Sequence, residues 1–312
     1  MLKRSRILVL LALIATMMVV SACTPATNES TTSGGSEEPN VVVTATNEYF
    51  ATMPEDIYKI DQVPFVEKVK AGEAMTILDI RSADAYAQGH IKGAINMPWG
   101  PNFAENLNKI PTDKPVMLYC VTGQTAGQTV VLLNLAGFDA KSVNLGWNLG
   151  IGKVDGLAEV TETTANLFDD SVNTAIDPDI EEAIVAYYVG LKDVADTKFA
   201  NYKITEEDAK AALDAKDETV TFLDVRKVED YDKGHIEGAA NIPFGKGMET
   251  QFSSLPTDKT IIVYCYTGQT AGQTVAGLRL LGYDAVSLNS GAGTAATGTT
   301  GWVNKGYPLV TN

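Results

Sequence analysis

The chain of 312 residues contains two copies of one long sequence pattern, and this duplication restricts its possible folds more than any other feature. Cys265 lies 145 residues after Cys120, and the same offset relates the two histidines of the chain. The register runs without a gap from residues 76–140 to residues 221–285, and about half of the aligned positions are identical. Solenoid repeats recur roughly every 20–50 residues, so a period this long indicates a duplicated domain. We therefore expect two similar domains.

Each copy has the alternating pattern of an α/β domain. Short apolar, β-branched runs alternate with helical patterns, which predicts a mostly parallel sheet flanked by helices. The expected strands are residues 76–80, 116–119 and 138–145 in the first copy, and 221–225, 261–264 and 283–288 in the second. The expected helices are residues 63–70 and 126–135, then 206–215 and 271–281. Thr205 with Asp208 indicates a helix start, and Gly137 and Gly282 indicate helix ends.

A segment of about 45 residues joins the two copies and includes an acidic helix candidate at residues 179–191. Residues 47–50 are its expected counterpart before the first copy. We expect each of these segments to dock on its own domain. The predicted plan is a first domain at residues 41–155, a linker with a helix at 156–201, and a second domain at 202–312.

The first 40 residues are expected to target and tether the protein. A basic start precedes a short apolar run at residues 7–20, which is typical of a secretory signal. The sequence Val-Ser-Ala-Cys that ends at Cys23 resembles the bacterial lipobox, in which the signal peptide is cut before a cysteine that is then lipidated; an ordinary secretory signal is the alternative. We expect a signal peptide at residues 1–22, a flexible tether at 23–40, and a lipid anchor at the outer face of the bacterial membrane or in the periplasm.

Charge and composition exclude several classes of partner. The formal net charge of −15 argues against nucleic acid, which requires basic surfaces. The cysteines and histidines form no CxxC or Cys/His cluster, so neither a metal nor a cofactor is expected. Contact with a membrane is expected only through the lipid.

The other two cysteines stand in nearly identical loops, each between an expected strand and an expected helix. The loops are Cys120-Val121-Thr122-Gly123-Gln124-Thr125 and Cys265-Tyr266-Thr267-Gly268-Gln269-Thr270. At the carboxyl end of a parallel strand such a loop faces the crevice where α/β folds bind ligands, and its N–H groups with the helix dipole favour an anion. A thiolate nucleophile or a persulfide would be stabilised there. Inert packing of both cysteines, or a disulfide between them, are the alternatives.

These loops and their surroundings make the chain similar to tandem rhodanese-domain proteins from about residue 55 to the end. The resemblance also rests on Asp-(Ile/Val)-Arg at residues 79–81 and 224–226, Gly-His-Ile-x-Gly-Ala at 89–94 and 234–239, and a Gly-Trp pair near each domain end, at 146–147 and 301–302. It implies a sulfurtransferase without a cofactor. Cys120 and Cys265 would take the outer sulfur of thiosulfate or polysulfide and pass it to a thiol or to cyanide.

The resemblance also implies roles for the other loop residues. The backbone N–H groups of residues 121–125 and 266–270 would form the anion cradle, and the Thr and Gln side chains at 122, 124, 267 and 269 would hydrogen-bond the donor. Neither loop carries Arg or Lys, so the cradle is expected to rely on backbone groups. Two other functions stay open: a binding protein that delivers sulfur without turnover, and phosphatase or arsenate chemistry, which needs a longer loop with an Arg.

Several other conspicuous residues are expected to have structural roles. Arg81 and Arg226 are expected to pair with acids such as Asp84 and Glu229. The two histidines are expected to be hydrogen-bonded within the fold. Trp99 and Phe244 would either line the mouth of a pocket or pack in the core, and Asp79 and Asp224 would bond backbone groups.

Overall fold

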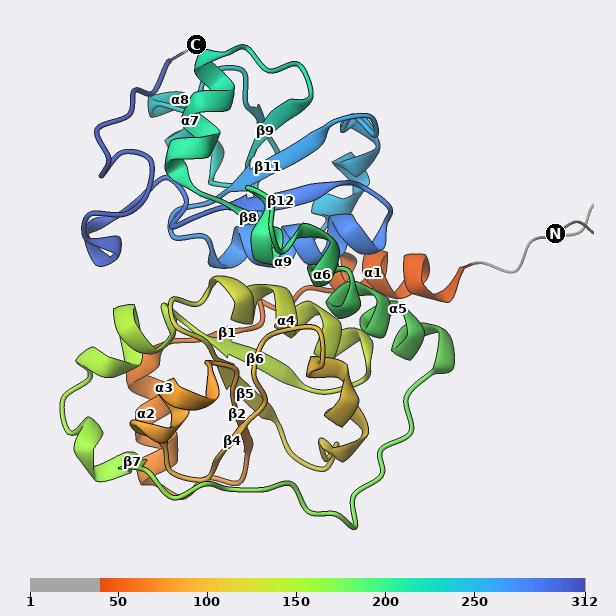
Figure 1. Ribbon diagram of the computed structural model, residues 1–312, viewed down its shortest axis with the longest axis vertical. Helices are drawn as coiled ribbons and strands as arrows, with labels where there is room; N and C mark the ends of the chain where they lie inside the picture. Colours follow the sequence, from red (N-terminus) through yellow and green to blue (C-terminus); the bar gives the residue numbers. More distant parts are fainter. Residues whose placement is uncertain (1–39, 312) are drawn as a thin grey trace, which may run out of the picture. The chain divides into compact units, whose positions relative to one another are not determined.

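The computed structural model describes residues 40–311 (Figure 1). The predicted signal peptide, the lipidation of Cys23 and nearly all of the tether lie outside the described residues. Within 40–311, no helix is long and apolar enough to cross a membrane.

The first half of the fold, from β1 to β7, is built on a five-stranded parallel sheet in the order β1-β6-β5-β2-β4. Its strands are β1 (Lys59–Ile60), β2 (Thr76–Asp79), β4 (Ala94–Asn96), β5 (Val116–Tyr119) and β6 (Ala140–Val143), with a separate antiparallel pair of β3 (His90–Ile91) and β7 (Thr161–Glu162). Its helices are α2 (Gln62–Lys70), α3 (Ala83–Ala87) and α4 (Gln124–Leu135), with a 3₁₀ segment η1 (Phe103–Lys109).

The second half, from β8 to the C-terminus, repeats this arrangement. Its parallel sheet has the order β10-β9-β11-β12-β8. The strands are β8 (Lys203–Ile204), β9 (Val220–Asp224), β10 (Ala240–Asn241), β11 (Thr260–Tyr264) and β12 (Ala285–Leu288). The helices are α7 (Glu206–Asp214), α8 (Val228–Lys233) and α9 (Gln269–Leu280), with a 3₁₀ segment η6 (Met248–Ser254). The predicted fold class, two α/β units with parallel sheets and flanking helices, is confirmed.

The local predictions are largely confirmed as well. Each of the six predicted strands is present, and the Thr205 side chain caps α7 by accepting the Asp208 N–H at 3.0 Å. Gly137 and Gly282 follow α4 and α9 with φ of +89° and +91°, the left-handed conformation that ends a helix. Both helices begin two residues earlier than predicted, so the last two residues of each Cys loop form a first helical turn.

The two halves meet where α4 packs against α9 (Figure 1). Two helical glycines allow this approach. A Cβ added at Gly127 would lie 2.2 Å from the carbonyl oxygen of Gln269, and one added at Gly272 would lie 2.4 Å from that of Gln124. Since a real Cβ essentially never comes within 3.0 Å of such an atom, any larger residue would force the helices apart.

The helix before the first half, α1 (Val41–Ala51), docks largely on the second half. The Tyr49 hydroxyl donates to Gln273 Oε1 of α9 at 2.7 Å. Phe50 is fully buried, and its ring packs edge-on against Phe252 with centroids 5.3 Å apart. Tyr49 also stacks on Tyr58 of the first half, with ring centroids 4.4 Å apart. The prediction that residues 47–50 dock on their own domain therefore holds for this stacking and is wrong for the contacts of Phe50.

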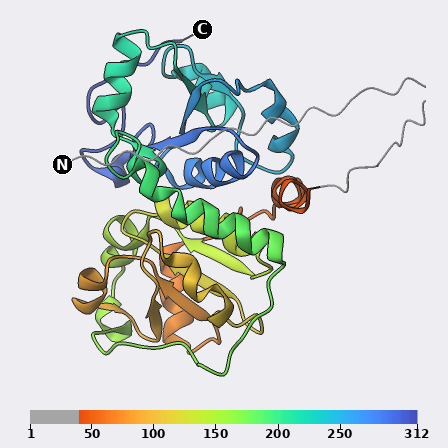
Figure 2. The ribbon, with the colours of Figure 1, turned by 45° about the vertical axis from the view of Figure 1, so that its right-hand side comes forward.

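The helix before the second half, α5 (Pro178–Val189), makes the reciprocal contacts with the first half. The Tyr187 hydroxyl donates to Gln128 Oε1 of α4 at 2.6 Å, and the Tyr188 ring stacks on Phe103 at 4.5 Å. The docking prediction is wrong for this helix too, although the prediction that the two helices are counterparts holds. Because α4 and α9 lie side by side, α1 can contact α9 of the second half and α5 can contact α4 of the first half (Figures 1 and 2).

Candidate active site

Each candidate nucleophile follows the carboxyl end of a central strand, directly before a helix. Cys120 follows β5 and is 3% exposed, while Cys265 follows β11 and is 2% exposed. The Gly123 N–H donates to Cys120 Sγ at 3.1 Å, and the Gly268 N–H donates to Cys265 Sγ at the same distance. The Ala126 N–H, which lies outside the predicted cradle, also reaches Cys120 Sγ at 3.4 Å. Both thiols are free.

The shape of each Cys loop depends on glycines. Gly123 and Gly268 both have a φ of +92°, which turns their N–H groups back toward the sulfur and is costly for other residues. A second glycine lies beneath each loop. A Cβ added at Gly146 would lie 2.5 Å from the Cys120 carbonyl oxygen, and one added at Gly291 would lie 2.3 Å from that of Cys265. Gly291, rather than the Gly301 of the predicted Gly-Trp pair, is thus the counterpart of Gly146.

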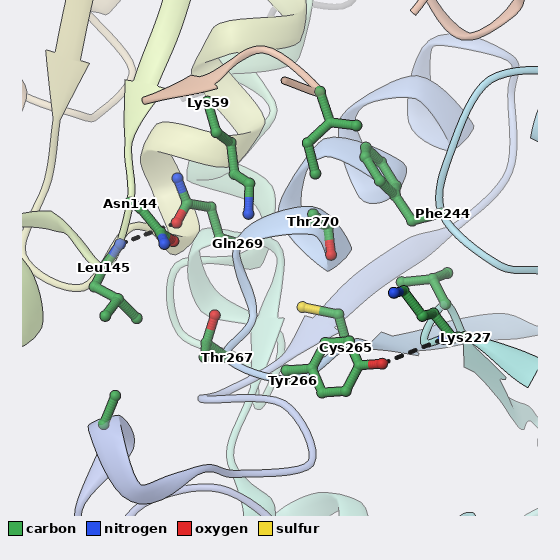
Figure 3. Close-up of a pocket in the computed structure, with 13 residues that line it drawn as sticks. Lys59, Asn144, Leu145, Lys227, Phe244, Cys265, Tyr266, Thr267, Gln269 and Thr270 are labelled. Carbon is green, nitrogen blue, oxygen red and sulfur yellow. Dashed lines mark hydrogen bonds between the residues drawn. The ribbon is translucent and has the colours of Figure 1, made fainter. Parts of the chain in front are cut away.

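A pocket of about 350 Å³ opens at Cys265 and is lined by both halves (Figure 3). Thr267, Thr270 and Phe244 come from the second half, and Lys59 and Leu145 come from the first. Figure 3 shows Cys265 and Lys59 directed into the same space from opposite sides. Of the two positions left open for Phe244, the structure shows both: the side chain lines this pocket and also packs against the hydrophobic core.

The rim of this pocket carries polar groups that the first half lacks. The Tyr266 hydroxyl donates to Asp230 Oδ2 at 2.5 Å and accepts the Lys227 N–H at 3.5 Å. Burial, together with the hydrogen bond to Asp230, raises the pKa of Tyr266 to about 12. In the first half, Val121 stands at the position equivalent to Tyr266, Ala85 at that of Asp230, and Ser82 at that of Lys227. The two sites therefore differ at the rim while sharing the same sulfur cradle.

The two loop glutamines, which are predicted to hydrogen-bond a sulfur donor, bond residues of the opposite half in this structure. The Gln124 amide donates to Ser287 Oγ at 2.6 Å, and the Gln269 amide donates to Ser142 Oγ at 2.9 Å. Gln269 Oε1 also accepts the Leu145 N–H at 3.1 Å. Donor binding by the loop residues stays a prediction. In the structure the glutamines tie each Cys loop to the strand next to the edge strand of the other sheet, β6 or β12.

Two lysines that sequence reasoning missed lie near the sulfurs. Burial lowers the pKa of Lys59, and charge interactions with Cys265 and then with Asp61 oppose this shift. Burial likewise lowers the pKa of Lys203, and the charge of Cys120 opposes it. The sequence does contain a signal for these lysines, because Tyr-Lys-Ile occurs at both residues 58–60 and 202–204. This repetition indicates a duplicated segment, but it does not indicate that each lysine lies near a cysteine.

The conspicuous arginines do not pair with the acids predicted. Arg81 binds Asp79 with both ε and η nitrogens, at 3.0 Å and 2.5 Å, and Arg226 binds Asp224 in the same way. These acids lie two residues before the arginines at the buried strand ends, whereas the predicted acids Asp84 and Glu229 lie outside on helices. Asp79 also accepts the Arg81 N–H, as predicted for its backbone role. Each ion pair fixes the turn that follows its strand, β2 in the first half and β9 in the second.

The histidines are held within the fold as predicted. His90 Nδ1 lies 2.8 Å from the Tyr86 carbonyl oxygen, and the two rings stack 3.5 Å apart. His235 makes the equivalent contacts with Tyr231. Trp99 is the position equivalent to Phe244, and it packs on Tyr188 of α5. Over residues 40–311, no group of three or more His, Cys, Asp or Glu side chains could hold a metal ion.

Comparison with known families explains this duplicated geometry. The sequence model of the rhodanese-like domain matches residues 64–150 and again residues 205–295, which together make up more than half of the chain. The chain belongs to the rhodanese-like family. Each match includes a Cys loop, so the two matched rhodanese-like domains correspond to the two halves of the fold.

Curated relatives share single stretches of this chain. The thiosulfate sulfurtransferase PspE of Escherichia coli is 37% identical over 71 residues, which cover 22% of this chain and 68% of PspE. The putative sulfur carrier protein YrkF of Bacillus subtilis is 31% identical over 84 residues, covering 27% of this chain and 44% of YrkF. A tRNA sulfurtransferase of Desulfurococcus amylolyticus is 24% identical over 195 residues, covering 60% of this chain and 39% of that protein. The chain thus spans less than half the length of the last two.

Among solved structures, a thiosulfate sulfurtransferase from Pseudomonas aeruginosa is 21% identical, covering 80% of this chain and 46% of that chain with a TM-score of 0.32. The family match and the curated relatives support sulfur transfer as the general chemistry of these domains.

Proposed function

We propose that the protein is a sulfurtransferase that carries sulfane sulfur as a persulfide on Cys120 and Cys265. One observation carries the proposal most strongly: at both cysteines, Sγ accepts a backbone N–H from a left-handed glycine of a loop that runs into a helix. Such a site favours a negatively charged sulfur, whether it is the thiolate or the terminal sulfur of a persulfide.

The proposed reaction has two displacement steps. The thiolate attacks the outer sulfur of thiosulfate, the S–S bond of the donor breaks, and sulfite leaves with the bonding electron pair. An acceptor then attacks the terminal sulfur of the persulfide and regenerates the thiolate; cyanide would leave as thiocyanate, and a thiolate as a new persulfide. Polysulfide would serve as donor in the same way, with a shorter polysulfide as the leaving group.

The pocket at Cys265 supports a donor or acceptor larger than thiosulfate. Its volume of about 350 Å³ and the side chains of Leu145, Phe244 and Val225 leave space for the organic part of a thiol or persulfide. The basic groups Lys59 and Lys227 at the same pocket would favour an anionic substituent.

Intact-protein mass after incubation with thiosulfate or with polysulfide tests the proposal. The wild-type chain is compared with Cys120→Ser and Cys265→Ser. A gain of one sulfur per intact cysteine, removed by cyanide, is the expected result. Absence of any gain with both donors, while a small alkylating reagent still reacts with both thiols, would refute sulfur transfer.

A second function, sulfur storage and delivery without turnover, is favoured by the low exposure of both cysteine residues. Stoichiometric loading followed by slow release to a simple thiol would support delivery. Repeated turnover with the same thiol would support the enzyme.

We further propose that the protein acts outside the cytoplasm, anchored by lipid at Cys23. The motif that ends at Cys23 supports this location. Metabolic labelling with a radioactive fatty acid in a bacterial host should mark the wild-type chain and not Cys23→Ser. Equal labelling of both would rule out this anchor.

A further inference from the structure

The most unusual feature of the two sulfur sites is that each lies close to a basic residue supplied by the opposite half. Lys59 belongs to β1 of the first half, yet it lines the pocket of Cys265 in the second (Figure 3). Lys203 begins β8 of the second half, as Lys59 begins β1 of the first, and its charge interacts with that of Cys120. Both lysines are half-buried.

The backbone before each lysine has an unusual conformation at matching positions. Ile57 and Tyr58 have φ of +50° and +54°, and Asn201 and Tyr202 have φ of +60° and +52°. Pairs of non-glycine residues in the left-handed region are uncommon and carry an energetic cost, so the surrounding structure must hold them. Such a turn aims the residue that follows it, which in both halves is the lysine.

Each turn receives a hydrogen bond from the opposite half in addition to those from its own. The Gln273 amide of α9 donates to the Ile57 carbonyl oxygen at 3.2 Å. The Gln128 amide of α4 donates to the Asn201 carbonyl oxygen at 3.3 Å. Each lysine-bearing turn is therefore fixed by the same helix that follows the cysteine it approaches.

The neighbouring strand is fixed in the same way. Lys59 pairs in register with Ser142 of β6, and the Ser142 hydroxyl accepts the Gln269 amide from the Cys265 loop. Lys203 pairs with Ser287 of β12, whose hydroxyl accepts the Gln124 amide from the Cys120 loop. A glutamine of each Cys loop thus bonds the strand that pairs with the lysine-bearing strand: β6 beside β1, or β12 beside β8.

We propose that the two halves exchange lysines, so that Lys59 is the charge partner of Cys265 and Lys203 is the charge partner of Cys120. Each ammonium stabilises the thiolate of the opposite half and, if the proposed function holds, the persulfide that forms on it. The basic group absent from both Cys loops is thereby supplied from the other half. Each site is complete only when both halves are assembled.

The pairing is reflected in the charges around each lysine. The charge of Cys265 is the largest influence that opposes the lowering of the Lys59 pKa by burial, ahead of Asp61, and that of Cys120 has the same effect on Lys203. Other titratable side chains at the Cys265 pocket are Lys227, which is exposed, and Tyr266, which stays protonated near neutral pH.

Alkylation of each cysteine by iodoacetamide, measured by peptide mass on the folded chain across a pH series, tests the exchange. Lys59→Gln should slow the reaction of Cys265 about fivefold near neutral pH and move its pH profile upward, leaving Cys120 unchanged. Lys203→Gln should slow Cys120 and spare Cys265. Lys59→Arg should restore most of the Cys265 rate, since it keeps the charge. A merely structural lysine would not give this charge-dependent, site-selective pattern.

The outcomes are decisive in either direction. If Lys59→Gln slows Cys120 instead, or slows both thiols or neither, the exchange is wrong. Should a lysine variant unfold, the reverse experiment replaces it: in Cys265→Ser, acylation of Lys59 by acetic anhydride should become faster while that of Lys203 is unchanged. Equal acylation rates of Lys59 in wild type and Cys265→Ser would also refute the exchange. Neither measurement involves sulfur donors, so failure here is distinct from failure to load sulfur.

Discussion

The seam between α4 and α9 gives a sharp test of how the two halves depend on each other. Gly127 lies inside α4, where alanine is normally preferred over glycine by about 1 kcal/mol. Its backbone is not in the left-handed region, so alanine meets no conformational barrier. On local grounds alone, Gly127→Ala should make the protein more stable.

The packing predicts the opposite sign. The new Cβ would lie 2.2 Å from the Gln269 carbonyl oxygen, which belongs to the backbone of the other half and cannot rotate away. Restoring an ordinary contact requires a shift of about 1 Å, and overpacking of this kind costs roughly 1–3 kcal/mol. We take the upper part of that range because the obstacle is main chain. After subtraction of the helix preference, Gly127→Ala should lower the free energy of unfolding by about 1–2 kcal/mol.

The shift should also reach the sulfur site across the seam. Gln269 follows Gly268, whose N–H bonds Cys265 Sγ, so displacement of Gln269 should change the alkylation rate of Cys265 more than that of Cys120. Gly272→Ala should show the reverse preference, because its Cβ would meet the Gln124 carbonyl oxygen at 2.4 Å.

Urea unfolding followed by tryptophan fluorescence gives the stability change, and residue-resolved alkylation gives the effect on each cysteine. Gly245→Ala is the matched control, because a Cβ there meets nothing within 4 Å and its φ is not in the left-handed region. The reasoning is refuted if Gly127→Ala is as stable as Gly245→Ala or more stable than wild type.

Three further predictions concern packing and charge. Phe50→Ala should cost about 3–4 kcal/mol of unfolding free energy in urea titrations, since the fully buried ring packs on the opposite half; the exposed Val43→Ala in the same helix should cost far less, and equal costs would contradict the docking of α1. Asp79→Asn should cost about 3–5 kcal/mol by the same assay, because it leaves the buried Arg81 without its carboxylate; a loss under 1 kcal/mol would mean that the pair matters little. Asp230→Asn should lower the pKa of Tyr266 from about 12 toward 10, because the carboxylate accepts a hydrogen bond from the neutral phenol and repels the phenolate. Ultraviolet titration, with Tyr266→Phe as the reference, measures this pKa. An unchanged value would assign the whole shift to burial.

The sequence was sufficient for the features that repeat within each copy. Period and composition placed the six strands, the α4 and α9 helices, and the cysteines between them, because hydrophobic patterning and glycine positions act locally. The same local information placed both histidines in structural roles.

Contacts between the copies were not predictable from the same signals. An aromatic pair such as Tyr49 and Phe50 shows that a helix has a face to bury, but the pair itself does not specify which half receives it. The charge partner of a cysteine was hidden for the same reason, since Lys59 precedes the first copy's core and acts on the second. The arginine error is of another kind: the predicted partner Asp84 is exposed, whereas Asp79, two residues before Arg81, is buried and binds its guanidinium.

The exchange of parts also bears on why both cysteine loops could be retained together. Gln269 bonds Ser142 of β6 in the first half, and Gln273 bonds the turn that precedes Lys59. A change that loosens the Cys265 loop would therefore disturb the strand beside Lys59, and the matching contacts of Gln124 would transmit a change the other way. Loss of chemistry at one cysteine would still leave its loop needed as a support for the other half. The near-identical loops therefore follow from shared packing as much as from shared chemistry.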